Sequence, residues 1–404
     1  MNAIARFFQK PIFQNKRFIM TIWFALPLIA ALKHIFREIG NNYLIFKYSF
    51  YHLIEQTNLY IQYPDQYFDT NHYGPFFSVI IGPFALLPDN AGSLLWELFI
   101  AATLFYAIYK LPIKWIGKVI IYWITFDSVF SNAANSQTNA MIAALIIGAF
   151  ICIRSGKDFW GTLFIAIGFF IKLYGIVGLA FFFFSKSKPK FIGYFLFWCV
   201  VCFVLPMAFS SPEFVVQSYI DWYHSLLEKD VSNSDSMMQN ISAIGMIYKI
   251  FKCYTISNFW ILIPAVLLFA IQYLQIGMYK DLRYQLGILA STLTFVVLFS
   301  TGSESCTYII ATVGFGIWFI MQEKPLSKYA IFMLVFMLVM TILASSDLSP
   351  TYVKKQIVRP YALKALPFLM MWLTLIYQLL TMKKPKKGMG LSDVYLEEDK
   401  KEKE

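Results

Sequence analysis

The sequence predicts an all-α, polytopic transmembrane protein. Of its 404 residues 58% are apolar and only 14% are charged, with a mean hydropathy of +0.59. Soluble domains carry about 25% charged residues, and an apolar run of about 18 residues is enough to cross a bilayer. Such runs follow one another along nearly the whole chain. This pattern excludes a soluble enzyme, a nucleic-acid-binding protein, a disordered chain and a disulfide-stapled secreted domain.

About twelve helices are expected to cross the membrane. The first follows a basic N-terminal segment that has no signal-peptide cleavage site. The proline-containing segment 74–89 is too short to cross upright, so we expect a half-helix on the outer side. The expected spans are residues 18–36, 92–110, 115–131, 139–153, 159–171, 173–185, 190–210, 259–279, 284–300, 307–322, 329–346 and 361–382. We expect one membrane domain over 1–382 and a charged cytoplasmic tail over 383–404.

The distribution of Lys and Arg predicts the orientation. If the chain crosses once between Pro75 and Lys110, 23 basic residues lie with the termini on the cytoplasmic side and 11 lie outside. Two crossings there would leave 12 inside and 22 outside, against the positive-inside rule. The net charge of +11 therefore reflects topology and anionic lipid. Two long loops, 37–91 and 211–258, are placed outside, and each contains an apolar, aromatic segment typical of an interfacial helix, at 43–54 and 241–252.

Carboxylates near the outer ends of the spans are candidate general bases. An aspartate in a turn-rich segment, or a glutamate at a helix start, can also serve only as a cap. A positioned carboxylate can instead take a proton from a hydroxyl group that attacks a substrate. The candidates are Asp69, Glu304, Asp65 and Glu38.

Lys172 is a lone charge in the aromatic run FFIKLYG. A charge at that depth costs a few kcal/mol on insertion scales, so it should meet an anion or line a wet cavity. A lysine that snorkels to the outer interface would give the same pattern. With Arg359 and Lys355 of the last outer loop, Lys172 is a candidate for binding a phosphate.

Amide and aromatic side chains on the same face are candidates for substrate binding. They are Asn42, His72, Tyr73, Gln137, Asn139, Tyr174, Gln239 and Asn240. Together with the carboxylates and cations, they would suit the transfer of a group from a lipid-phosphate carrier, because fixed positive charges stabilise a departing phosphate. No metal or cofactor is expected, and Cys199 and Cys202 look like buried apolar side chains.

Short motifs over nearly the whole membrane portion resemble glycosyltransferase family 87, which has the GT-C fold. In order they are NNYLIFKYSFYHLI, NLY, YFDTNHYGPFFSVIIGPFALLPD, LLWEL, NSQTNAMIAAL, IKLYG, QNISAIG and FSTGSESCTYIIA. The resemblance implies an inverting enzyme in a bacterial inner membrane. It would transfer a sugar, a hexose such as mannose, from a polyprenyl-phosphate donor to a lipid or glycan acceptor on the outer face.

The chain departs from the family pattern at the expected base. Family members typically carry an aspartate just beyond the first span, where this chain has Asn41 and Asn42. Since asparagine cannot accept a proton, the role would pass to another carboxylate. We place Asp69 and Glu304 first.

Two other classes of protein fit the same pattern. A transporter or lipid flippase would also place polar residues at broken helices, and it would move a substrate without forming a covalent product. An O-antigen polymerase or ligase would also be polytopic with large outer loops, but it would use diphosphate-linked glycans. A transfer assay with defined donors separates the three.

Overall fold

The computed structural model describes residues 10–36, 39–234, 239–253, 255–345 and 350–383. Every regular element in these ranges is a helix, which confirms the predicted all-α class. The chain divides into two compact units. Unit 1 comprises Met1–Ala25, Ile108–Ser128 and Met237–Glu404, and unit 2 comprises Leu26–Ala107 and Val129–Ser236.

Unit 1 contains mainly the C-terminal helices. Its elements are η1 (Pro11–Gln14), the start of α2 (Lys16–Phe36), most of α6 (Trp115–Ala133), α11 (Ala243–Phe251), α12 (Phe259–Ala270), η4 (Ile271–Leu274), η5 (Ile276–Met278), α13 (Leu282–Leu298), η6 (Ser305–Thr307), α14 (Tyr308–Ile320), α15 (Lys328–Ser345), η7 (Val353–Val358) and α16 (Ala365–Thr381). Its core includes α13, which packs against α14 and α16. A Cβ atom on Gly314 would lie only 2.9 Å from the carbonyl oxygen of Ala290, so this glycine lets α13 and α14 approach closely.

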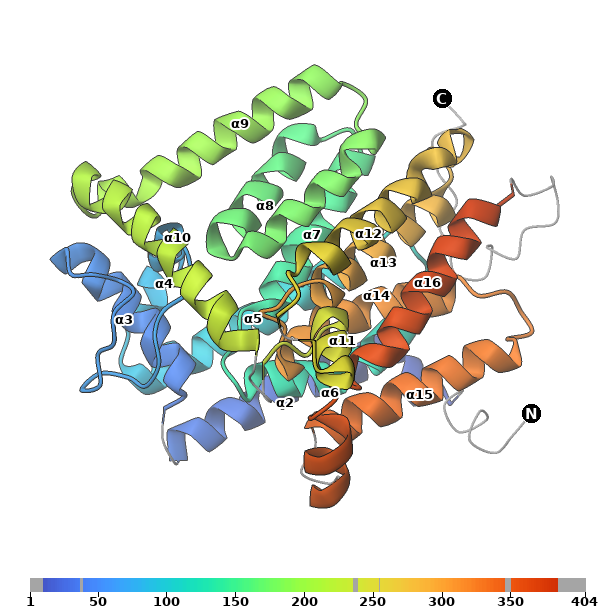
Figure 1. Ribbon diagram of the computed structural model, residues 1–404, viewed down its shortest axis with the longest axis horizontal. Helices are drawn as coiled ribbons and strands as arrows, with labels where there is room; N and C mark the ends of the chain where they lie inside the picture. Colours follow the sequence, from blue (N-terminus) through green and yellow to red (C-terminus); the bar gives the residue numbers. More distant parts are fainter. Residues whose placement is uncertain (1–9, 37–38, 235–238, 254, 346–349, 384–404) are drawn as a thin grey trace. The chain divides into compact units, whose positions relative to one another are not determined.

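Unit 2 contains the long loop that was predicted after the first span, together with the central helices. Its elements are the rest of α2 and α6, α3 (Asn41–Glu55), α4 (Pro75–Ala85), most of α5 (Asp89–Tyr109), α7 (Asn139–Arg154), α8 (Asp158–Ile171), η2 (Leu173–Phe184), α9 (Lys188–Val204), η3 (Leu205–Ala208) and α10 (Pro212–Ser234). Figure 1 shows α7, α8 and α9 side by side, in agreement with their contacts.

The α8–η2 junction is a break between two apolar helices. Lys172 has an extended backbone there, with φ −154° and ψ 123°. A Cβ atom on Gly175 would overlap the backbone of Gly168, so only glycine permits the chain to fold back this tightly. Residues 173–184 form a 3-10 helix after the break. The turn therefore places a lysine at the junction, as its position between two predicted spans indicated.

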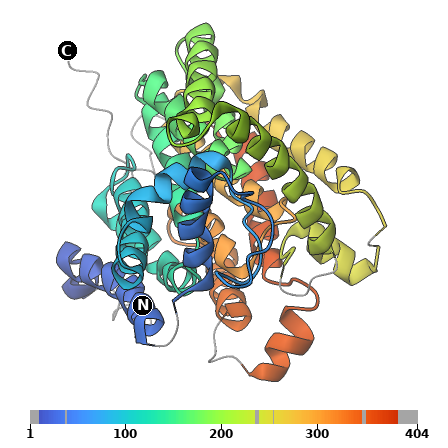
Figure 2. The ribbon, with the colours of Figure 1, turned by 90° about the vertical axis from the view of Figure 1, so that its left-hand side faces the viewer.

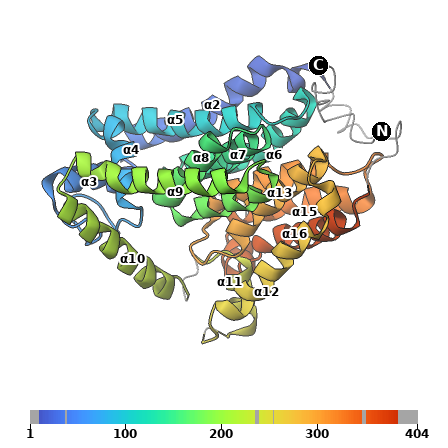
Figure 3. The same cartoon turned by 90° about the horizontal axis from the view of Figure 1, so that it is seen from above.

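The loop after α3 lies against α10 in unit 2. Figure 2 shows this loop, in blue, beside the yellow-green helix, and the indole nitrogen of Trp222 on α10 donates to the carbonyl oxygen of His72 at 2.9 Å. Figure 3 shows α9 leading into α10 through a short turn. The segment 211–258 was predicted to be a loop at this point, so α10 was not expected. The other two predicted outer helices are present as α3 and α11.

Most predicted spans coincide with helices within a few residues, but their number as membrane crossings is not confirmed. Only α5 and the stretch Lys188–Ala208 are both long and apolar enough, among the described residues, to pass as spans; other apolar helices are shorter. Two expected spans differ in form. Residues 259–279 divide into α12 and two 3-10 turns, and α16 begins at Ala365 after a π-helical turn, η7. The predicted half-helix at 74–89 is the 11-residue α4. The predicted single domain and tail stay predictions, and residues 384–404 lie outside the described ranges.

Candidate active site

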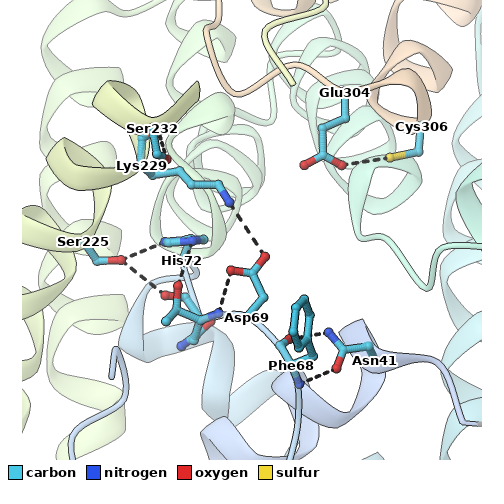
Figure 4. Close-up of polar contacts among 11 residues, drawn as sticks. Asn41, Phe68, Asp69, His72, Ser225, Lys229, Ser232, Glu304 and Cys306 are labelled. Atoms are coloured by element: carbon cyan, nitrogen blue, oxygen red, sulfur yellow. Dashed lines mark hydrogen bonds and ion pairs between the residues drawn. The ribbon is translucent and has the colours of Figure 1, made fainter. Parts of the chain in front are cut away.

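Asn41 fixes the position of the loop that carries Asp69. Its side-chain nitrogen donates to the carbonyl oxygen of Phe68 at 2.5 Å, and its side-chain oxygen accepts from the Phe68 amide at 2.7 Å (Figure 4). The amide side chain thus pairs with both backbone groups of the residue before Asp69. A carboxylate at position 41 could accept from the Phe68 amide but could not donate to its carbonyl.

Asp69 is an accessible carboxylate in a constrained backbone. Its φ of 82° lies in the left-handed region, and its Oδ1 accepts from the Thr70 amide at 2.8 Å. Its Oδ2 lies 3.9 Å from the ammonium group of Lys229 on α10, and its side chain is 52% exposed. An exposed pair at this distance contributes little to stability. Asp69 is therefore held in place by the backbone and its carboxylate can be reached by a substrate.

His72 is held by hydrogen bonds at both ring nitrogens. The Ser225 hydroxyl donates to the carbonyl oxygen of Asn71 at 3.3 Å, so we assign the His72 Nδ1 as the donor to Ser225 Oγ at 2.8 Å. Its Nε2 then accepts from the Thr70 hydroxyl at 3.1 Å. The network satisfies a neutral imidazole. Protonation at Nε2 would remove the acceptor that the Thr70 hydroxyl uses.

Burial lowers the pKa of His72 to about 4, and the positive charges of Lys229 and Lys172 act in the same direction. The carboxylate of Asp69 opposes them. The ring is therefore neutral at pH 7 and acts as a structural clamp between the loop and α10 rather than as a cation.

The depressed pKa of His72 predicts a loss of stability in acid. The unfolded chain binds a proton at an ordinary histidine pKa of about 6.5, while the folded chain resists it down to about 4. The stabilisation is present above pH 6.5 and is lost as the pH falls from about 6.5 towards 4. We expect the Tm of the wild-type protein to fall more over this window than that of His72→Asn. Thermal unfolding in detergent at pH 7.0 and 4.5 measures this, and equal falls in Tm would contradict it.

Lys172 faces an amide and two aromatic rings. Its Nζ donates to the side-chain oxygen of Asn139 at 3.2 Å and lies 4.7 Å from the ring centre of Tyr174 and 5.9 Å from that of Tyr73. These three partners were all sequence candidates. These contacts hold the ammonium group at the C-terminal end of α8.

Tyr73 connects this lysine to the polar tip before α7. Its hydroxyl oxygen accepts from the Thr138 hydroxyl at 3.1 Å and lies 3.4 Å from the side-chain oxygen of Gln137. Asn42 at the start of α3 donates to the carbonyl oxygen of Asn135 at 2.7 Å. The structure therefore brings Asn42, Tyr73, Gln137, Asn139, Lys172 and Tyr174 together around one tip. Asp69 and His72 precede Tyr73 in the same loop, by four residues and one residue.

Unit 1 carries candidates of its own. Glu304 and Thr307 make a capping box at the start of η6, and the Cys306 thiol donates to Glu304 Oε2 at 3.5 Å. Glu304 thus has the helix-capping role that its position permits. The neighbouring Ser305 accepts two hydrogen bonds from Lys364 Nζ, at 2.9 Å to its carbonyl oxygen and 2.8 Å to its hydroxyl oxygen.

Gln239 and Asn240 lie beside the Glu304 tip, because the Ile241 amide donates to the carbonyl oxygen of Ser303 at 2.7 Å. The carbonyl oxygen of Gln239 accepts from Lys249 at 3.0 Å. Asn240 is fully buried, and its side-chain oxygen accepts from the Ser242 hydroxyl. Burial lowers the pKa of Lys249 to about 8. This arrangement stabilises the start of α11 and leaves Asn240 little access to a substrate.

The remaining candidates differ in exposure. Asp65 and Lys355 are exposed, and Arg359 is half-buried at the end of η7. Glu38 lies outside the described residues.

Three residues of these groups, Ser225, Lys229 and Lys364, were not predicted from the sequence, and neither was the buried Glu97 on α5. Ser225 and Lys229 lie four residues apart on α10, so they share a face that only recognition of this helix would reveal. Glu97 on α5 is 1% exposed. Its carboxyl group interacts with the side chain of Ser136, although neither side chain has a hydrogen bond of normal geometry. An ionisable residue in an apolar span was the available signal.

No three His, Cys, Asp or Glu side chains gather as a metal site within the described part of the chain. Apolar helices of this kind are typical of a membrane protein, and the polar and charged side chains in the loops at their ends are typical of an enzyme's site. The sequence model of glycosyltransferase family 87 matches residues 71–301. This is more than half of the chain, so the protein belongs to glycosyltransferase family 87 and is a glycosyltransferase. No curated protein matches the chain.

Proposed function

We propose that the protein transfers a sugar, a hexose such as mannose, from a polyprenyl-phosphate donor to a lipid or glycan acceptor on the outer face of a bacterial inner membrane. The observation that carries this proposal is the loop 69–73 of unit 2. This loop carries the accessible carboxylate of Asp69 and, four residues later, Tyr73, whose ring faces the ammonium group of Lys172. A base and an anion-binding cation are the two groups that such a transfer needs.

The proposed reaction is a single displacement. Asp69 takes the proton of an acceptor hydroxyl, whose oxygen attacks the anomeric carbon of the donor sugar. The bond between that carbon and the phosphate oxygen breaks, and the polyprenyl phosphate leaves with the electron pair. Lys172 stabilises the charge on the departing phosphate, and the configuration at the anomeric carbon is inverted. Gln137, Asn139 and the rings of Tyr73 and Tyr174 are proposed to hold the sugar.

The contacts of Asn41 support Asp69 as the base. The family resemblance places an aspartate where this chain has Asn41 and Asn42, and the side chain of Asn41 pairs with Phe68, the residue directly before Asp69. We propose that in this chain Asp69, in the loop that Asn41 holds, takes the role of the aspartate that the family carries at the start of α3. Asn41 is then a positioning residue for the base.

Asn41→Asp is expected to lower transfer even though it introduces the residue that the family typically carries. It removes the donor to the Phe68 carbonyl and sets a negative charge beside that oxygen, at a cost of about 1–3 kcal/mol. We expect several-fold lower kcat, with little change in the KM for the donor. Steady-state kinetics of the purified enzyme measures both, with Asp65→Asn as the control. A variant more active than the wild type would contradict the positioning role.

The function itself is tested with the purified protein in lipid nanodiscs. Supplied with a polyprenyl-phosphate hexose and a membrane lipid extract, it should form a glycosylated product with inverted anomeric configuration. Transfer only from a polyprenyl-diphosphate glycan would favour the polymerase or ligase alternative. Movement of lipid between leaflets in vesicles without any product would favour the flippase and would overturn the proposal.

A further inference from the structure

The outward side of α10 carries a continuous apolar stripe. Its members are four, three, four and four residues apart, which places them along one side of a helix with 3.6 residues per turn. Each is between 43% and 75% exposed. They are Val216, Ile220, Tyr223, Leu227 and Val231.

A second exposed edge of the same helix is polar, and the third side faces the protein. Gln217, His224 and Glu228 are exposed next to the apolar stripe. The inward side carries Trp222, which donates to the carbonyl oxygen of His72, and Ser225, which accepts from its ring. A helix at the surface of a soluble protein has one apolar side that packs against the protein and one polar side that faces water. Three distinct sides indicate contact with protein, water and an apolar medium at once.

The preceding helix, α9, carries an exposed apolar stripe of its own. Ile192, Leu196, Val200 and Val204 recur at every fourth position of that helix and are 46% to 62% exposed. The stretch Lys188–Ala208 is apolar enough to cross a membrane, and only 17% of its most apolar window is buried. Figure 3 shows α9 leading into α10 through the short turn that contains η3. The same medium that covers the exposed side of α9 therefore extends to the stripe of α10.

We propose that α10 is an interfacial helix that lies at the surface of the bilayer with its apolar stripe in the outer leaflet. The exposed tyrosine of the stripe fits this depth, because aromatic side chains with a polar tip favour the headgroup region. The polar edge faces water, and the inward side holds the loop 69–73. The apolar stripe of α10 is therefore in contact with lipid.

This placement also assigns a depth to the candidate site. Ser225 and Lys229 lie on the inward side of α10, so an interfacial helix keeps Asp69 and His72 level with lipid phosphate groups. This consequence rests on the proposed function, whereas the membrane contact of α10 does not. A lipid-linked donor could then reach the site without leaving the leaflet.

Spin labels on the two exposed edges test the membrane contact. The five free cysteines are first replaced, and the background is accepted only if it elutes as the wild type does. Leu227→Cys and His224→Cys are then labelled in separate variants and reconstituted in nanodiscs. We expect the label at 227 to collide preferentially with oxygen, which concentrates in the acyl region, and the label at 224 to collide preferentially with a water-soluble nickel chelate.

Two results would overturn the proposal. Ready access of the nickel chelate to position 227 would place the stripe in water. Shielding of that label from both reagents would show that a protein, either a partner or a second copy of this chain, covers the stripe. Neither readout needs catalytic activity, so the test holds whether or not the proposed transfer is observed.

A pair of charge substitutions tests the consequence for the site. Leu227→Glu places a charge on the stripe, and His224→Glu places the same charge on the polar edge. We expect Leu227→Glu to lower transfer from the lipid-linked donor several-fold and His224→Glu to leave it within about twofold of the wild type. Equal effects of the two substitutions would contradict a role of the stripe in catalysis, and the spin-label result would still report the position of α10.

Discussion

Asp69→Asn is expected to lower kcat for sugar transfer at least about a hundredfold, because a positioned general base contributes about 10²–10⁴ in rate. Asparagine is the best substitute at this position. It tolerates the left-handed φ of 82°, and its side-chain oxygen can still accept from the Thr70 amide at the 2.8 Å contact. The loop should therefore keep its conformation while the proton acceptor is lost. The donor KM should change little, since the carboxylate acts on the acceptor hydroxyl.

Asp65→Asn is the matched control for this substitution. It makes the same chemical change in the same loop at an exposed position, so transfer should remain within about twofold of the wild type. Glu304→Gln separates the two leading bases. Because Glu304 caps a helix through Thr307, we expect lower stability and only a modest loss of kcat. Full activity in Asp69→Asn together with none in Glu304→Gln would show that the base is Glu304.

The helices could be predicted from the sequence because apolar runs are a local signal. The runs around 92–110, 139–153 and 329–346 correspond closely to α5, α7 and α15. The break at Lys172 could also be expected, since a charge interrupts an aromatic run there. In contrast, α10 was missed because its polar and apolar residues alternate with a helical period at low mean hydropathy, which a search for apolar runs overlooks.

The candidate site could be predicted only in part, because its members meet through tertiary contacts. The types of residue were evident from charges and amides at the ends of spans. Asn41 and the Phe68 with which it pairs are 27 positions apart in the sequence, and the pairing of Lys229 with Asp69 depends on an unpredicted helix. Neither pairing can be predicted from a local sequence pattern, because its two residues lie far apart in the chain. The neutral state of His72 likewise follows from burial and from two hydrogen bonds that no local pattern indicates.

Lys172→Met is expected to lower kcat/KM for the donor by about tenfold or more. Methionine has a similar unbranched side chain, which can lie against the Tyr174 ring, but it carries no charge. A hydrogen bond to a charged group contributes about 1.5–3 kcal/mol, which corresponds to roughly tenfold to a hundredfold. If Lys172 stabilises the departing phosphate, kcat should fall as well as donor affinity, because negative charge on that oxygen grows as the bond to the sugar breaks.

Two further variants decide how this loss is interpreted. Lys172→Arg retains the positive charge and should recover part of the activity, because a guanidinium group also binds phosphate although its geometry differs. Lys186→Met removes an exposed lysine from the other end of η2 and should leave both constants unchanged. A KM that rises while kcat stays constant in Lys172→Met would show that the lysine binds the donor equally in the ground and transition states. Equal kinetics in Lys172→Met and wild type would remove Lys172 from the donor site altogether.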